Sequence, residues 1–154
     1  MSAIHAVTVL AVSAAPIAEL RGGLPLAISH GFSPAAAFFL AIAGNLLPVL
    51  PILLGLGWGE RIARRWSLLE RPLDWVLART RRKGWLIERY GAIGLILLVA
   101  IPLPATGAWT GAIAAFLFGI PSKRAFPLIT VGVLIAGVVV LALTLSGIRL
   151  FTAT

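Results

Sequence analysis

Two charged residues stand close together in an otherwise apolar stretch, Glu19 and Arg21 in the segment PIAELRGGLP at 16–25. Charge inside a bilayer is costly, so an acidic side chain within an apolar segment is a functional candidate by default. Desolvation would favour the neutral carboxyl of Glu19, whereas the neighbouring guanidinium would favour the carboxylate. A carboxyl group balanced in this way can take up and release a proton during transport. The alternative is that residues 3–19 form a plain span with the charged pair at its aqueous end.

Small residues follow this pair and recur in the second half of the chain, as Gly22-Gly23 and Thr110-Gly111. Each pair is predicted to open a short helix, whose free N–H groups and dipole attract anions. Arg21 adds a guanidinium that can donate two parallel hydrogen bonds to a phosphate. Glycine also lets a ligand approach the backbone, although the same glycines can serve only to pack helices closely. The pattern favours an anionic ligand group over a cationic one.

Other residues at breaks in the apolar segments could line the same binding site. Prolines stiffen the bends, hydroxyl and indole groups donate hydrogen bonds, and Asn45 interrupts the first long span together with Pro48 and Pro51. Asn45 could instead only satisfy the backbone at that kink. Beyond those already named, the predicted substrate-binding or proton-coupling residues are Pro25, Asn45, Pro102, Pro104, Thr106, Gly107 and Trp109.

The sequence predicts no catalytic, metal or cofactor site. There is no cysteine, and the two histidines, His5 and His30, lie far apart in the sequence without an acidic neighbour. Thiol chemistry is therefore excluded, and a histidine-rich metal site is not expected. The hydroxyl residues lack a His–acid partner at a suggestive spacing, and no P-loop occurs. The chain is predicted to be neither an enzyme nor an ATP-driven pump.

The composition is that of an integral membrane protein. Of the 154 residues, 60% are hydrophobic and 12% are charged, and the mean hydropathy is +1.03. These values exclude a disordered chain, a collagen, a coiled coil and a secreted disulfide scaffold. The net charge is +8, and nine of the thirteen basic residues fall between Arg61 and Arg89. Basic residues gathered in one loop of an apolar chain are typical of a cytoplasmic loop facing anionic lipid, not of nucleic-acid binding.

The apolar segments come in two lengths. The longer ones, at 34–57 and 125–148, contain 24 residues each. As helices they are about 36 Å long, enough to cross a hydrocarbon core of about 30 Å. Four others are too short to cross alone and lie at 3–15, 22–31, 91–101 and 111–120. Such pieces can enter and leave a membrane on the same side as a re-entrant hairpin, provided that the break is buried in protein.

The two halves of the chain resemble each other at an offset of 88 residues, with ten identities over residues 10–50. This supports a duplication, and the alternative is coincidence in a chain rich in Ala, Leu and Gly. If each half is a hairpin followed by one span, residues 59–90 and Lys123-Arg124 lie on the same side, which is then the cytoplasm. Four simple spans would place that basic pair outside. We therefore predict an inverted repeat, in which each half is a re-entrant helical hairpin plus a transmembrane helix.

These elements are predicted to form one all-α integral membrane domain over 1–154, multi-pass in the inner membrane. It contains a first repeat at 1–57, a basic amphipathic cytoplasmic segment at 58–90 and a second repeat at 91–154. The middle segment has one apolar helical face at 4-3-4 spacing: Ile62, Trp66, Leu69 and Leu73. Pro72 can open a second helix there and Gly84 can close it. The segment is either an ordinary connector or a docking surface for anionic lipid headgroups.

Two motifs, PIAELRGGLP at 16–25 and PLPATG at 102–107, resemble the small multidrug export family, which is grouped with the DedA and VTT-domain membrane proteins. The resemblance covers nearly the whole chain and implies paired re-entrant hairpins and transport across the inner membrane. DedA relatives imply a lipid carrier phosphate such as undecaprenyl phosphate as substrate, with dependence on the proton gradient. VTT relatives imply lipid scrambling. In one departure, DedA proteins carry arginines in the second hairpin motif, whereas residues 101–111 hold none.

The predicted function is a transporter or flippase for an amphipathic anion, either polyprenyl phosphate or a phospholipid headgroup. Glu19 would be the proton-responsive acid and Arg21 the headgroup ligand. One alternative is export of lipophilic cationic drugs, with Glu19 as the counter-charge. Another is a non-transporting membrane scaffold whose basic segment docks a lipid or a partner. Membrane lipids are the expected partners, and a homodimer is expected because two full spans bury little interior.

Overall fold

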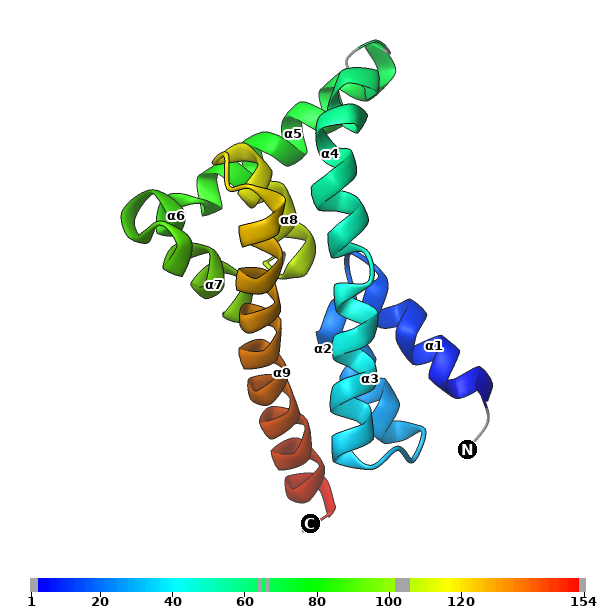
Figure 1. Ribbon diagram of the computed structural model, residues 1–154. Coiled ribbons are helices and arrows are strands. Elements are labelled where there is room, and N and C mark those ends of the chain that lie inside the picture. The colour runs from blue at the N-terminus through cyan, green and yellow to red at the C-terminus, as the bar shows by residue number, and fades with distance from the viewer. Residues whose placement is uncertain (1–2, 64, 66, 102–105, 153–154) are drawn as a thin grey trace.

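The chain is helical throughout its described part. The computed structural model describes residues 3–63, 65, 67–101 and 106–152. Within those ranges the chain forms the helices α1 to α9 and no strand (Figure 1). The predicted all-α class is therefore confirmed.

Two short helices, α1 (Ala3–Ala14) and α2 (Glu19–Ser29), form the first hairpin. With 12 and 11 residues, they are about 18 and 16 Å long and cannot reach across a hydrocarbon core alone. The predicted start of the second helix, at 22, is three residues late. Glu19 is instead the first residue of α2 and adopts a positive φ of 46°. This places the charged pair in the first helical turn rather than in the connecting turn.

A long apolar helix follows in two pieces, α3 (Pro34–Leu46) and α4 (Val49–Ala63). The Ser33 hydroxyl caps α3 by accepting a hydrogen bond from the backbone N–H of Ala36 (3.3 Å). The break at Leu47-Pro48 arises because proline has no N–H to continue the helical ladder. The predicted interruption of this span is thus confirmed.

The second half repeats this order with α7 (Ala92–Ala100), α8 (Ala108–Leu117) and the long α9 (Ser122–Thr152). The two short helices match the predicted segments within a few residues. Two helical stretches, Pro34–Gly59 and Ser122–Leu150, are long enough and apolar enough to cross a membrane. The same two stretches were predicted from hydropathy.

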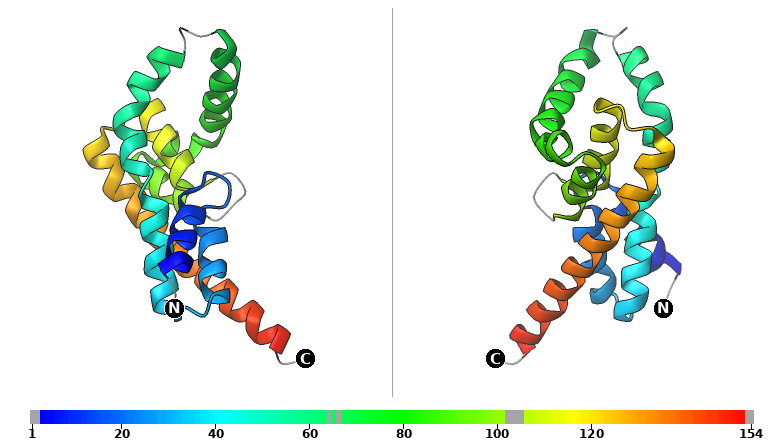
Figure 2. Two further views of the ribbon diagram at one scale, coloured as in Figure 1. Left: turned by 90° about the vertical axis from the view of Figure 1, so that its right-hand side faces the viewer. Right: turned by 60° about the vertical axis from the view of Figure 1, so that its left-hand side comes forward.

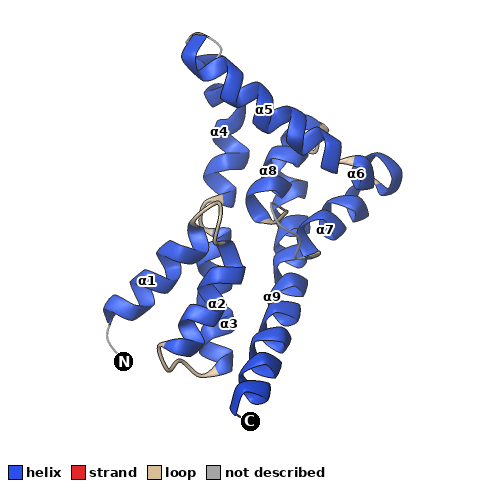
Figure 3. Cartoon of the chain, turned by 180° about the vertical axis from the view of Figure 1, so that it is seen from behind, coloured by secondary structure: helices blue, strands red, loops and turns tan. Residues whose placement is uncertain are grey.

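Two helices join the halves, α5 (Ser67–Lys83) and α6 (Trp85–Tyr90). Gly84 ends α5, as predicted. The prediction that Pro72 opens a second helix is wrong, because α5 runs through it. A proline removes only its own N–H from the helical ladder, so the turns on either side can hold the helix together. Figure 3 shows α5 crossing from the end of α4 toward α6 beside α8.

The long helices lie side by side and run in opposite directions, with α9 packed against both α3 and α4. In Figure 2 α9 crosses this pair at an angle, and its C-terminal end projects from the body. From the centre of the molecule, α2 runs toward one end and α8 toward the other (Figure 1). One core unites the halves, with Leu24 of α2, Leu95 of α7 and Ile129 of α9 all fully buried in it.

Glycines that the 88-residue offset aligns occupy similar places in the two halves. A Cβ on Gly44 of α3 would lie 2.8 Å from the carbonyl oxygen of Leu10 in α1. A Cβ on Gly132 of α9 would lie 2.7 Å from Cβ of Val99 in α7. Each long helix thus approaches the first helix of its own hairpin at a glycine. This likeness supports the duplication, while the inverted repeat in a membrane stays a prediction.

Candidate functional site

The turns of the two hairpins meet at the centre of the molecule and are joined by hydrogen bonds. The indole Nε1 of Trp109 donates to the carbonyl oxygen of Ala14 (3.0 Å). Arg21 Nη2 donates to the carbonyl oxygen of Thr106 and, at 3.4 Å, to its hydroxyl oxygen. The Thr106 hydroxyl donates to the carbonyl oxygen of Ile101 (2.9 Å). Residues 85 and 95 positions apart in the sequence are thereby held together at one junction.

Glu19 of the first half lies at the N-terminus of α8 in the second half. Its side chain is 7% exposed, and its Oε1 accepts a hydrogen bond from the backbone N–H of Trp109 (3.3 Å). A helix N-terminus attracts negative charge through its free N–H groups and its dipole. Glu19 therefore occupies the anion-binding end that the sequence predicted for this helix, and an outside anion would have to replace it.

Gly107 provides the space for this carboxylate. Its φ of 154° and ψ of −159° belong to a region that only glycine adopts readily. A Cβ at this position would lie 2.6 Å from the carboxyl carbon of Glu19. The glycine is thus required for both its backbone conformation and its lack of a side chain.

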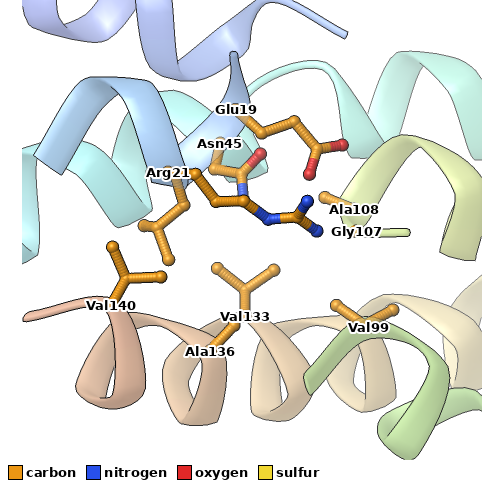
Figure 4. A pocket seen from close by; sticks show the side chains of 10 residues that line it. Glu19, Arg21, Asn45, Val99, Gly107, Ala108, Val133, Ala136 and Val140 are labelled. Atoms are coloured by element: carbon orange, nitrogen blue, oxygen red, sulfur yellow. The ribbon is translucent and has the colours of Figure 1, made fainter. Parts of the chain in front are cut away.

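Arg21 and Asn45 share a small enclosed cavity with Glu19 and Gly107. Figure 4 shows the guanidinium of Arg21 extended between Glu19 and the valine side chains of α9. The cavity has a volume of about 10 Å³, comparable to the space for one water molecule. A second cavity of about 130 Å³ also contains Glu19 and Arg21 in its lining, together with Thr106 and Thr110.

Asn45 is 2% exposed, and its Oδ1 has no hydrogen-bond partner among the described residues. A buried unsatisfied acceptor costs about 1–3 kcal/mol. The placement of Asn45 beside Arg21 leaves a free acceptor in the lining of the enclosed cavity.

Five of the predicted site residues that the structure describes are absent from the lining of these two cavities: Gly22, Gly23, Pro25, Trp109 and Gly111. A Cβ on Gly23 would lie 2.9 Å from Cβ of Ser13, and a Cβ on Gly111 would lie 2.5 Å from Cγ2 of Val99. A Cβ on Gly22 would lie 2.9 Å from Cβ of Ala18. Pro25 lies within α2. For the glycines, these contacts favour the packing alternative over close approach of a ligand. Pro102 and Pro104 lie outside the described residues.

One pairing was missed by the sequence reasoning. His5 and His30, which are far apart in the sequence, stack with ring centroids 4.4 Å apart and an interplanar angle of 9°. The signal was available, because folding α1 back on α2 about a turn near residue 17 places position 5 opposite position 30. The predicted hairpin thus implied the pairing.

Comparison with known proteins gives one match. A family model described as "Putative small multi-drug export protein" matches residues 19–139. The matched stretch is well over half of the chain and begins at Glu19. It therefore includes residues 19–25 of the first motif and all of the second motif at 102–107. No curated protein and no solved structure matches the chain.

Proposed function

The chain belongs to the small multi-drug export protein family, a family of membrane transporters by its description, and on that premise we propose that it moves an amphipathic anion across the inner membrane. The proposed cargo is a polyprenyl phosphate or a phospholipid headgroup. The kinship with DedA and VTT-domain proteins stays part of this proposal.

The proposed membrane arrangement makes each hairpin re-entrant. The four short helices cannot span alone, and residues beside the two breaks are hydrogen-bonded to each other, Trp109 to Ala14 and to Glu19. Glu19 and Thr106 are buried there, whereas Ile17 in the first turn is exposed. A backbone break at membrane depth is tolerated where protein surrounds it. Residues 59–90 would then face the cytoplasm with their basic side chains, and the hairpins would enter from opposite faces.

The observation that carries the proposal is the position of the Glu19 carboxylate. It comes from the first half of the chain and accepts a hydrogen bond at the N-terminus of α8 in the second half. A proton on this carboxyl removes its negative charge and weakens its hold on the Trp109 N–H. A phosphate oxygen of the cargo can then accept that hydrogen bond, with Arg21 beside it in the same cavities. Proton uptake and anion binding are thereby coupled, because the protein's own acid and the cargo compete for one place.

The positions of Glu19 and Arg21 disfavour the alternative function, export of lipophilic cations. A lipophilic cation would need Glu19 as its counter-charge, but this carboxylate already faces backbone N–H groups, and Arg21 contributes to the lining of both cavities around it. Like charge in the lining disfavours a cation. Export of lipophilic cations thus stays the second candidate, supported by the name of the family alone.

The test is Glu19→Gln in purified protein reconstituted into vesicles, with uptake of a fluorescent lipid phosphate measured under an imposed pH gradient. We expect uptake to fall by about tenfold or more, since the amide cannot exchange a proton. The matched control is Glu88→Gln, which removes an exposed acid from α6 and should leave uptake unchanged. Uptake of a cationic dye that depends on Glu19, with no uptake of the lipid phosphate, would replace the proposal by the cationic alternative. Unchanged lipid uptake in Glu19→Gln would refute the role of Glu19.

A further inference from the structure

A larger cavity lies between α5 and α8, next to the junction where the turns of the two hairpins meet. Its volume is about 460 Å³, and α5 packs directly against α8. On the α5 side it is lined by Trp75, Arg79 and Lys83, and on the α8 side by Trp109 and Ile113. The sequence reasoning placed α5 at the membrane interface but did not place it beside the tips.

Two cations line this cavity, Arg79 and Lys83, which lie one helical turn apart on α5. Burial, followed by the charges of Arg79 and Arg21, lowers the pKa of Lys83 below its usual value of 10.5. The guanidinium of Arg21 thus lies close enough to contribute to this lowering, after burial and Arg79. No acidic side chain is among the described residues that line the cavity. An anion in the cavity would therefore reduce the repulsion between Arg79 and Lys83.

The rest of the lining is mostly apolar and aromatic, with the hydroxyl residues Thr80 and Thr110 as exceptions. Trp75 is 62% exposed, and the Arg79 guanidinium lies 5.3 Å from the centre of its ring. Trp109 and Ile113 form the opposite wall. Cations next to large apolar side chains suit a molecule with an anionic head and a hydrocarbon tail.

The cavity adjoins the site at the tips. It shares Pro16 and Thr110 with the 130 Å³ cavity that contains Glu19 and Arg21 in its lining. A further cavity of about 520 Å³ shares Lys83 with it on one side and Thr106 with the tip cavity on the other. Lys83 thus stands where two large cavities meet beside the junction.

We propose that the cavity between α5 and α8 is a docking site for the phosphate headgroup of a membrane lipid, bound by Arg79 and Lys83 with its first carbons against Trp75 and Trp109. The docked headgroup would then lie in a cavity that shares Pro16 and Thr110 with the cavity lined by Arg21. Its onward passage to Glu19 rests on the proposed function, whereas docking itself does not.

The experiment compares two double variants of the full chain that each remove two positive charges from α5. Arg79→Gln with Lys83→Gln changes the cavity, and Arg71→Gln with Arg81→Gln changes two exposed cations that are absent from its lining. The protein is held in phosphatidylcholine nanodiscs and titrated with phosphatidic acid, and the change in tryptophan fluorescence reports binding. We expect binding to weaken by about tenfold or more in the cavity variant relative to the control variant.

Equal weakening in the two variants would overturn the proposal, because general attraction of an anionic lipid to a basic helix depends on charge and not on position. Inorganic phosphate that competes as well as phosphatidic acid would overturn the assignment to a lipid. Arg79→Lys with Lys83→Arg keeps both charges and should retain binding, which separates lost contacts from lost folding. Glu19→Gln should dock phosphatidic acid normally, so docking can be upheld even if the transport proposal fails.

Discussion

Replacing Gly107 by alanine tests the junction most directly. The backbone of this residue, at φ 154° and ψ −159°, lies in a region that is essentially restricted to glycine, and alanine there costs about 1–3 kcal/mol. The added Cβ would also lie 2.6 Å from the carboxyl carbon of Glu19, closer than real Cβ contacts. The carboxylate must therefore leave the α8 N-terminus, and a hydrogen bond to a charged group is worth about 1.5–3 kcal/mol. Together, the two effects should lower the free energy of unfolding by about 2.5–6 kcal/mol.

The assay is reversible denaturant unfolding in detergent micelles. The control is Gly55→Ala within α4, where a Cβ meets nothing within 4 Å and helix propensity predicts a gain of up to about 1 kcal/mol. In a Glu19→Ala background only the backbone strain remains, so Gly107→Ala should then cost about 1–3 kcal/mol. An equal cost in both backgrounds would refute the contact between the carboxylate and Gly107. A cost no larger than that of the control would refute the whole argument.

Three further predictions concern the cavity, the basic helix and the topology. Asn45→Leu should raise the free energy of unfolding by about 1–3 kcal/mol, since it removes an unsatisfied buried oxygen, and a loss of stability in the same unfolding assay would contradict this. Because the pKa of Lys83 is lowered, the folded chain releases this proton at a lower pH than the unfolded chain. Between the lowered pKa of the folded chain and 10.5, the contribution of Lys83 to the free energy of unfolding should therefore rise with pH, and Lys83→Gln should remove that contribution; an unchanged rise in this interval would refute the assignment to Lys83. Reporter tags on both ends should be external, whereas two internal tags would support four simple spans.

Much of the helical architecture could be predicted because it rests on local signals. Hydropathy over windows of about 20 residues separates the two long segments from the short ones, and glycine and proline mark their ends. Pro72 misled the prediction because a proline occurs both at the start of a helix and inside a helix that continues past it, as α5 does. The three-residue error at the start of α2 has a tertiary cause, since Glu19 is held in place by a helix that lies 90 residues further along the chain.

The residues of the site were predicted better than their roles. Glu19, Arg21, Asn45, Thr106 and Gly107 do come together, because charge and breaks inside apolar segments are rare enough to stand out. Their partners follow from packing between the halves, which one sequence does not reveal. The approach of α5 to the tips depends on how a 17-residue helix is placed by its neighbours, and periodicity determines only which face is apolar.

The two tips differ in charge, and the structure gives this difference a physical reason. The first tip supplies both charged side chains, and the second supplies the backbone that receives them, through the N–H of Trp109 and the carbonyl of Thr106. A charge on the second tip would have to share this small space with Glu19 or Arg21. The cations that the second tip lacks stand nearby on α5 instead, where Lys83 is close enough to respond to Arg21. Positive charge thus stands beside the junction without a further charge inside it, and on the proposed function it would attract the anion while Glu19 still occupies its place.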